Sequence, residues 1–162
     1  MKIPDPYMCG ETSGRKTARE IKPDDLGKRL SRADKVLFIL ASEVGQYPVN
    51  ILKGIIEKTN ATVYKTEAAG TEDVDIKADA RYGLMEIVDR LCDGLGGEYD
   101  YVVLVGVPYH IETRMLSGLR SYGVKHLVTL NWRHQQYADF SFSNTPKREK
   151  WIEKLEQIVE SS

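Results

Sequence analysis

Two histidines, a glutamate and an arginine come nearest to an acid–base arrangement in this 162-residue sequence. His110 and His134 each follow soon after an apolar run, and Glu43 and Arg133 occupy comparable positions. A histidine beside a carboxylate can transfer protons at neutral pH. A lone histidine in a loop is more often solvated or engaged in a hydrogen bond. No Gly-x-Ser-x-Gly, phosphate-loop or His-Glu-x-x-His motif accompanies these residues, so we predict no catalytic residues.

The cysteines bear on electron transfer. Only Cys9 and Cys92 are present, far apart in the sequence, whereas an iron–sulfur cluster usually takes four cysteine ligands at a recognisable spacing. We therefore predict no metal ligands in this chain. Cys92 lies beside an apolar helical stripe and is interpreted as a core residue. Cys9 is interpreted as structural, with contact to a partner left open.

Composition excludes several classes of protein. The formal net charge is −1 and no basic stripe is present, so nucleic acid is not an expected partner. No apolar run approaches the roughly 18 residues that a membrane span needs. The N-terminal residues lack the apolar core of a signal peptide, and the expected location is the cytoplasm.

The elements that would position these side chains follow from apolar patterning. Residues 36–40, 102–105 and 127–130 are continuous apolar runs, and residues 61–64 form a weaker one. Runs of this kind are typical of parallel strands covered on both faces. Amphipathic stretches surround them, starting near Pro23, Val49, Leu84, Ile111 and Trp151. We predict a single Rossmann-like α/β domain over residues 21–162, a three-layer sandwich with a parallel sheet, preceded by an arm over residues 1–20.

Ligands of such sheets gather at the carboxyl ends of the strands, where the strand order reverses. This rule selects the loops at residues 41–45, 66–70, 106–110 and 131–134. The candidate cofactor-binding residues in them are Ser42, Gly45, Gly70, Gly106, Tyr109, Asn131 and Arg133. Glycines in such positions more often serve tight strand-to-helix turns than ligand binding. No Gly-x-Gly-x-x-Gly lies between a strand and a helix, and the glycine cluster at residues 94–97 indicates a helix stop.

Residues 132–144 are the least generic segment, because aromatic and small polar residues alternate there. The aromatic members are Trp132, Tyr137, Phe140 and Phe142. They suit a planar ligand ring or a protein interface, or a long loop that packs its own aromatics on the sheet edge. Charge is also uneven: residues 15–35 hold eight basic and four acidic residues, and residues 67–100 hold three basic and ten acidic ones. These are solvated faces or patches that orient the domain on a larger partner.

Several of these segments resemble, in order, the epsilon subunit of the archaeal acetyl-CoA decarbonylase/synthase (carbon monoxide dehydrogenase/acetyl-CoA synthase) complex. The matching stretches are residues 21–23, 32–40, 99–106, 124–127 and 137–144. The similarity runs from about residue 21 to the C-terminus and rests on the sum of these stretches.

The resemblance implies a non-catalytic, cytoplasmic subunit of an archaeal complex of methanogenesis and one-carbon metabolism. Its implied partner is the alpha subunit of carbon monoxide dehydrogenase, which carries the nickel–iron–sulfur chemistry, in an assembly of two alpha and two epsilon subunits. The implied fold is similar to the NAD/FAD-binding domain known from deoxyhypusine synthase. The implied role is to stabilise the alpha subunit in CO oxidation and reversible acetyl-CoA cleavage; FAD binding for electron transfer is the alternative. This chain has Ala41-Ser42 where the family tends to have glycine, and a side chain there would crowd a phosphate.

Overall fold

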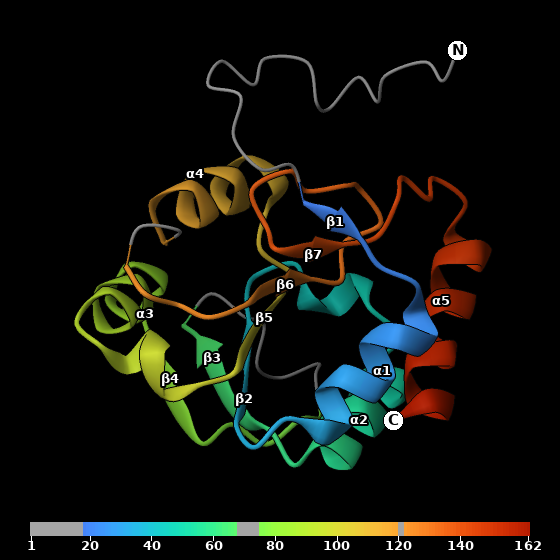
Figure 1. The fold of residues 1–162 in the computed structure, drawn as a ribbon, viewed down its shortest axis with the longest axis horizontal. Helices are drawn as coiled ribbons and strands as arrows, with labels where there is room; N and C mark the ends of the chain where they lie inside the picture. Colours follow the sequence, from blue (N-terminus) through green and yellow to red (C-terminus); the bar gives the residue numbers. More distant parts are fainter. Residues whose placement is uncertain (1–17, 68–74, 120–121) are drawn as a thin grey trace.

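One parallel β-sheet organises the part of the chain that the computed structural model describes, which is residues 18–67, 75–119 and 122–162 (Figure 1). The strands within these ranges lie in the order β1-β7-β6-β5-β2-β3-β4. They are β1 (Arg19–Glu20), β2 (Val36–Leu40), β3 (Thr62–Thr66), β4 (Ala80–Tyr82), β5 (Tyr101–Val105), β6 (Leu127–Thr129) and β7 (Phe140–Ser141). The helices are α1 (Pro23–Arg32), α2 (Val49–Thr59), α3 (Leu84–Cys92), α4 (Tyr109–Leu119) and α5 (Arg148–Ser161), with short 3₁₀ turns at Val44–Gln46 and Leu95–Glu98.

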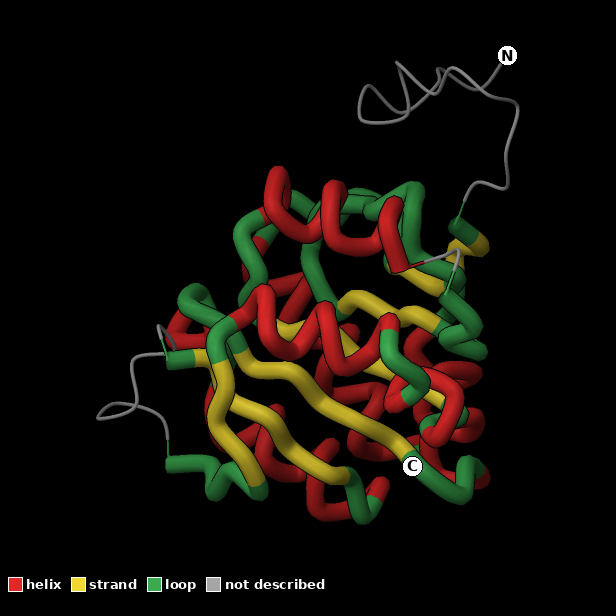
Figure 2. Tube along the Cα trace, turned by 90° about the vertical axis from the view of Figure 1, so that its left-hand side faces the viewer, coloured by secondary structure: helices red, strands yellow, loops and turns green. Residues whose placement is uncertain are grey.

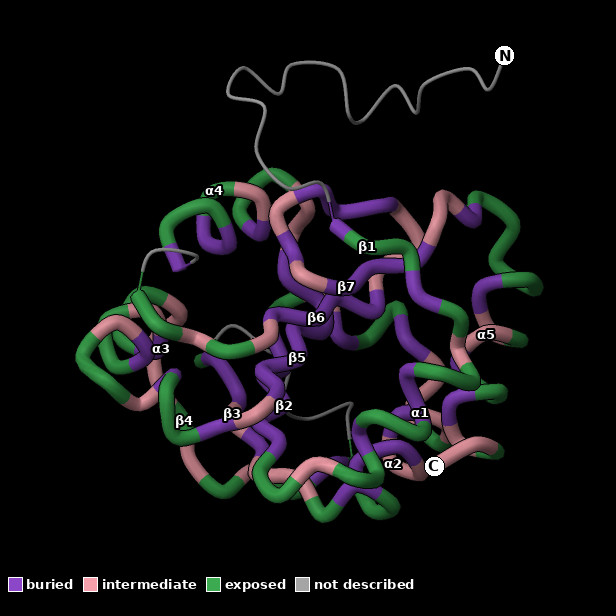
Figure 3. The backbone as a smooth tube through the Cα atoms, viewed as in Figure 1, coloured by how far each residue is buried: buried purple, intermediate pink, exposed green. Residues whose placement is uncertain are grey.

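The centre of the sheet is formed by β2 and β5, every residue of which is buried (Figure 3). Val36 pairs with Tyr101 and Leu40 with Val105, in parallel register. Such strands bury both faces and therefore read as continuous apolar runs rather than alternating ones. The three strong strand predictions and the weaker one at residues 61–64 are confirmed.

Helices cover both faces of the sheet, as predicted. Alternate residues of β2 point to opposite sides: Phe38 packs with α1, α2 and α5, and Leu37 packs with α3 and α4. Figure 2, viewed from the side of α3, shows helices in front of and behind the strands. The fold is therefore the three-layer α/β sandwich that the sequence predicted. Within the described ranges, no helix is both long and apolar enough to cross a membrane.

The beginning and the end of the described chain lie together. Arg19 pairs with Phe140 at the sheet edge, and α1 packs closely on α5. Gly27 permits that close approach, because a Cβ at this position would meet the Ser161 side chain and the Ile158 carbonyl.

Sequence analysis did not predict β1, β4 or β7, since strands of two or three residues are too short for a periodic pattern. Of the expected arm, residues 1–17 lie outside the described residues, whereas Arg19–Glu20 belong to the sheet.

Candidate functional site

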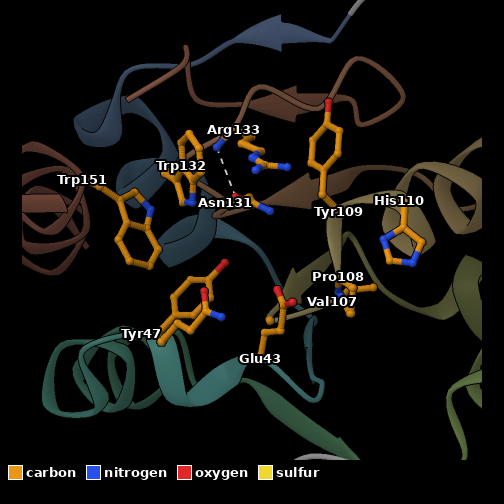
Figure 4. A pocket seen from close by; sticks show the side chains of 12 residues that line it. Glu43, Tyr47, Val107, Pro108, Tyr109, His110, Asn131, Trp132, Arg133 and Trp151 are labelled. Carbon is orange, nitrogen blue, oxygen red and sulfur yellow. Dashed lines mark hydrogen bonds between the residues drawn. The ribbon is translucent and has the colours of Figure 1, made fainter. Parts of the chain in front are cut away.

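The strand order reverses between β2 and β5. From β2 the chain continues to β3 on one side, and from β5 it continues to β6 on the other. The loops that leave these two strands diverge, and parallel α/β sheets bind ligands at such a point. A hollow of about 360 Å³ opens there, which we call the aromatic cleft (Figure 4). It is lined by Glu43, Gln46, Tyr47, Gly106, Val107, Pro108, Tyr109, His110, Asn131, Trp132, Arg133 and Trp151.

The floor of the aromatic cleft is two loops joined by their backbones. The Glu43 N–H donates to the Gly106 carbonyl at 2.8 Å, and the Ala41 N–H donates to the Val105 carbonyl at 2.9 Å. Gly106 has φ +77°, and a Cβ there would fall on the backbone nitrogen of Val44. A glycine is required here because the neighbouring loop approaches so closely. The space that its missing side chain leaves is filled by the protein's own backbone.

Aromatic side chains form one wall of the cleft and are fixed by the fold. The Trp151 Nε1–H donates to the Leu130 carbonyl at 2.8 Å. The ring of Tyr47 meets that of Trp151 edge-on, with centroids 4.7 Å apart. Burial, with the nearby carboxylate of Glu112, raises the pKa of the Tyr47 phenol well above its usual range, although a backbone hydrogen bond from Gly106 opposes the shift. Tyr47 is therefore a neutral, packed wall residue.

Arg133 is the cation of the cleft. Its guanidinium carbon lies 4.8 Å from the ring centroid of Trp132 and 5.4 Å from that of Tyr109, within the range of cation–π attraction. Its backbone N–H donates to Asn131 Oδ1 at 3.1 Å. Figure 4 shows Glu43 across the cleft from Arg133. The cleft thus combines aromatic faces with one cation and one carboxylate, which suits a planar group with polar edges.

A buried carboxyl group lies in the helix that borders the cleft. Glu112 is 1% exposed, and one of its oxygens accepts a hydrogen bond from Gln135 Nε2 at 3.2 Å. Burial raises the pKa of Glu112 to about 8; the Gln135 bond opposes this, and the charge of Glu43 adds to it. At neutral pH the group is therefore mainly protonated.

The two histidines follow the more common alternatives given above, solvation for one and a hydrogen bond for the other. His110 is exposed at the rim of the cleft. His134 is buried, and its Nδ1 lies 3.0 Å from the Phe142 carbonyl. The Tyr109 hydroxyl donates to the His134 carbonyl at 2.8 Å. Consequently His134 joins the loop to the sheet edge, and Tyr47 and Glu112 are the ionisable groups at the cleft whose pKa values are strongly raised.

The predicted cofactor-binding residues do not all lie in one site. Gly106, Tyr109, Asn131 and Arg133 line the aromatic cleft. Ser42 lines a second hollow, described next. Gly45 is exposed, with no atom within 4 Å of its Cβ position, and Gly70 lies outside the described residues.

Sequence analysis missed four residues around the cleft, namely Gln46, Tyr47, Trp151 and Glu112. Trp151 was assigned only to a helical stripe, and Tyr47 follows the loop that was selected. Glu112 carries a sequence signal, because it shares a helix face with Met115, Leu116 and Leu119 and a charged residue on an apolar face is unusual.

The second hollow, which we call the apolar groove, measures about 330 Å³ and lies beside the N-terminal ends of α3 and α4. It is lined by Ala41, Ser42, Thr66, Glu67, Gly83, Leu84, Pro108 and Ile111. Pro108 lines both hollows, so the first turn of α4 separates them. Thr66 is 2% exposed, and its Oγ1 has no hydrogen-bond partner among the described residues.

The segment from Trp132 to Asn144 divides between the two interpretations given above. Phe140 and Phe142 are buried in the core on the α5 side, and Tyr137 packs against the core on the α4 side. Trp132 alone among its aromatics lines the cleft. The segment is therefore mainly a loop that packs its own aromatics on the sheet, with one ring left for a ligand.

Metal binding finds no support in the ranges that the structure describes: no group of three or more His, Cys, Asp or Glu side chains there could hold an ion. Cys92 packs at the edge of the α3 and α4 core, in agreement with its interpretation as a core residue. Burial first, and then the charges of Asp89 and Asp93, raise the pKa of its thiol, which makes it a poor nucleophile. Cys9 lies outside the described residues.

Comparison with known protein families gives a match over nearly the whole sequence. The model of the family described as CO dehydrogenase beta subunit/acetyl-CoA synthase epsilon subunit matches residues 1–159. The match includes both hollows and every strand of the described sheet.

Proposed function

The chain belongs to the CO dehydrogenase beta subunit/acetyl-CoA synthase epsilon subunit family, and from this premise we propose that it is a non-catalytic accessory subunit that stabilises its complex. The proposed partner is the carbon monoxide dehydrogenase alpha subunit, in an assembly of two copies of each. The proposal extends to a cytoplasmic, archaeal complex of one-carbon metabolism, because the segments quoted above resemble the archaeal subunits.

The observation that carries this proposal is that three polar side chains at and beside the aromatic cleft hold the fold of the chain itself together. Trp151 is bonded to the Leu130 carbonyl and Tyr109 to the His134 carbonyl. His134 faces the Phe142 carbonyl. An enzyme site of general acid–base type needs a base within hydrogen-bond reach of a group that it activates. Because these side chains are held by backbone carbonyls, they support a scaffold rather than a reacting centre.

Co-expression with the alpha subunit tests the proposal. We expect the two chains to co-elute on size exclusion, and the alpha subunit purified alone to lose CO oxidation activity faster on heating than the complex does. Stabilisation by a bound subunit follows from mass action, because binding to the folded state alone raises its stability. The isolated chain should show no CO oxidation. Separate elution at micromolar concentrations, or equal inactivation rates with and without this chain, contradicts the proposal.

Flavin binding in the aromatic cleft is the second candidate function. It is favoured by the position of the cleft at the strand-order reversal, with Trp132 and Arg133 beside Asn131. These residues fit a planar ring. They do not fit a diphosphate, because the backbone of Glu43 and Val44 fills the space at Gly106 and the Glu43 carboxylate lines the same hollow. The cleft would therefore hold a flavin or purine ring while the diphosphate of FAD lay outside.

Titration with FAD and with riboflavin, which lacks the diphosphate, tests this second function. Equal quenching of the fluorescence of both ligands, reduced in Trp132→Ala, would support ring binding in the cleft. Arg133→Lys is the matched variant, since it keeps the charge but loses the planar guanidinium. Unchanged fluorescence of both ligands eliminates the flavin function and leaves the accessory role untouched.

A further inference from the structure

The apolar groove has an unusually apolar rim. Met85, in the first turn of α3, is 67% exposed, and Ile111, in the first turn of α4, is 37% exposed. Leu84 and Pro108 line the hollow between these helix starts. Single exposed apolar residues are ordinary on protein surfaces, but a cluster around a hollow marks a contact surface.

The hydroxyl of Thr66 is a second, independent indication that the groove lacks a contact. The residue lies at the carboxyl end of β3 and lines the hollow. Its hydroxyl is shielded from solvent and has no hydrogen-bond partner in the described structure. Buried hydroxyl groups in folded proteins nearly always have a partner, because an unpaired one costs free energy. Thr66 therefore offers an unpaired hydroxyl in the wall of the groove.

The charged side chains around the groove indicate which kind of partner would bind there. Glu67 lines the hollow and is exposed, and Glu86 follows Met85 directly. Further along the same surface, Asp89 and Asp93 are exposed as well. Arg90 is the basic side chain among them; it lies 3.3 Å from Glu86 and over the ring of Tyr82 at 4.0 Å. The α3 side of the groove is therefore acidic, although Arg81 on β4 and Arg114 on α4 are exposed as well, and this side complements a basic partner.

We propose that the apolar groove docks a segment of the alpha subunit in which an apolar side chain is flanked by lysine or arginine. The apolar side chain fills the hollow between Leu84 and Ile111. The basic side chains face Glu67 and Glu86, and a polar group of the segment pairs with the Thr66 hydroxyl. This inference rests on the proposed function, since it names the surface by which the accessory subunit binds its partner.

The charge pattern of the rest of the molecule favours one side for docking. Helix α1, with acidic residues in its first turn and basic residues in its last, lies on the opposite face of the sheet from α3, together with α5 (Figure 1). A basic partner is therefore attracted more by the acidic α3 surface than by the α1 surface, and this difference orients the subunit. A second copy of this chain, binding through its own α1, is the competing occupant and is distinguished below.

Affinity of the full chain for the purified alpha subunit tests the groove. We expect Ile111→Glu and Met85→Lys each to weaken binding by at least about tenfold, because both place charge in an apolar contact. Glu67→Lys should weaken binding several-fold and reduce its dependence on salt. Thr66→Val should weaken binding without disturbing the fold, since it removes only the hydroxyl.

Matched controls carry the same chemical changes elsewhere. Tyr122→Lys changes an exposed apolar residue beyond the C-terminal end of α4, and Glu156→Lys reverses an exposed charge on α5. Both should bind like the wild type. Circular dichroism and the unfolding midpoint of every variant identify any that fail to fold, and Thr66→Val remains informative if Ile111→Glu does so.

The outcomes separate the two proposals. If the wild type binds the alpha subunit and the groove variants bind as the controls do, the groove proposal is overturned and the accessory function stands. If the groove variants lose self-association on light scattering while alpha binding is unchanged, the occupant is a second copy and the proposal is again overturned. If the wild type itself does not bind the alpha subunit, the proposed function fails and the groove proposal fails with it.

Discussion

The aromatic cleft and the apolar groove lie on either side of the first turn of α4, yet they are built differently. In the cleft, Trp151 and Tyr109 donate to backbone carbonyls. In the groove, the Thr66 hydroxyl is buried without a partner among the described residues, as is Nε2 of His134 beside the cleft, and Met85 is mostly exposed. The aromatic wall of the cleft is bonded in the free chain, whereas the groove leaves apolar side chains exposed. Substitutions in the cleft should therefore change the stability of the isolated chain, and substitutions in the groove should change mainly its assembly.

Trp151→Ala should have the largest effect. The side chain is buried between α5 and the cleft, and removing a buried tryptophan costs about 3–5 kcal/mol in the free energy of unfolding. Urea denaturation measures it. Trp151→Phe keeps most of the packing and should lose about 1 kcal/mol with the bond to Leu130. Met85→Ala in the groove should stay within about 0.5 kcal/mol. Similar losses for Trp151→Ala and Met85→Ala would remove the contrast between the two hollows.

Glu112 should make stability depend on pH. The folded chain keeps this proton up to a pKa of about 8, whereas the ordinary pKa of a free glutamate side chain is 4.5. Between these values the folded state binds more protons than the unfolded state, so stability falls as pH rises through this window and levels off above it. The expected fall is on the order of 3 kcal/mol. Glu112→Gln, which keeps the amide contact without an ionisable group, should flatten the profile. A wild-type unfolding midpoint that is constant from pH 5 to 8 would contradict the buried, neutral state.

Two glycines of the predicted site should behave oppositely. Gly106→Ala forces a positive φ on alanine and places a Cβ on the Val44 backbone, at a cost of roughly 2–3 kcal/mol. Gly45→Ala meets no atom and should be neutral or slightly stabilising. Thermal unfolding of both variants measures the difference. Equal midpoints would mean that the two loops do not approach as closely as described.

Thr66→Val should have a small effect on the isolated chain, and of opposite sign to that of Trp151→Ala. Replacing an unpaired buried hydroxyl with a methyl group should raise the free energy of unfolding by about 1 kcal/mol. Thr145→Val is the matched control, because the Thr145 hydroxyl donates to the Ser143 carbonyl at 2.8 Å and accepts from Lys154. That variant should be destabilised. Loss of stability in both variants would show that the groove is as complete as the cleft.

The sequence predicts the sheet better than the site, because the residues of a strand are consecutive whereas the residues of the site lie far apart along the chain. Continuous apolar runs such as residues 36–40 identify a strand locally, because burial on both faces leaves a local pattern. Tyr47 and Trp151 line the cleft and Glu112 lies beside it, and the three residues come from separate parts of the chain. A local sequence pattern does not show that such distant residues lie close together in the fold. Gly106 was selected correctly as a strand-end glycine, but its neighbour proved to be the Val44 backbone. Strands β1 and β7 were not predicted, because a strand of two residues is too short to show a periodic apolar pattern.

The pairing of β1 with β7 also sets an order for folding during synthesis. A ribosome releases α1 early, but the partner of α1 in its layer is α5, the last helix, and the partner of β1 is β7. The apolar face of α1, with Leu26 and Leu30, therefore stays uncovered while most of the chain is made. The central strands can pair sooner, since β2, β3 and β5 precede both late elements. Joining distant parts of the chain closes the longest loops and slows folding, so we expect α1 to lack its contact with α5 until the last helix has been translated.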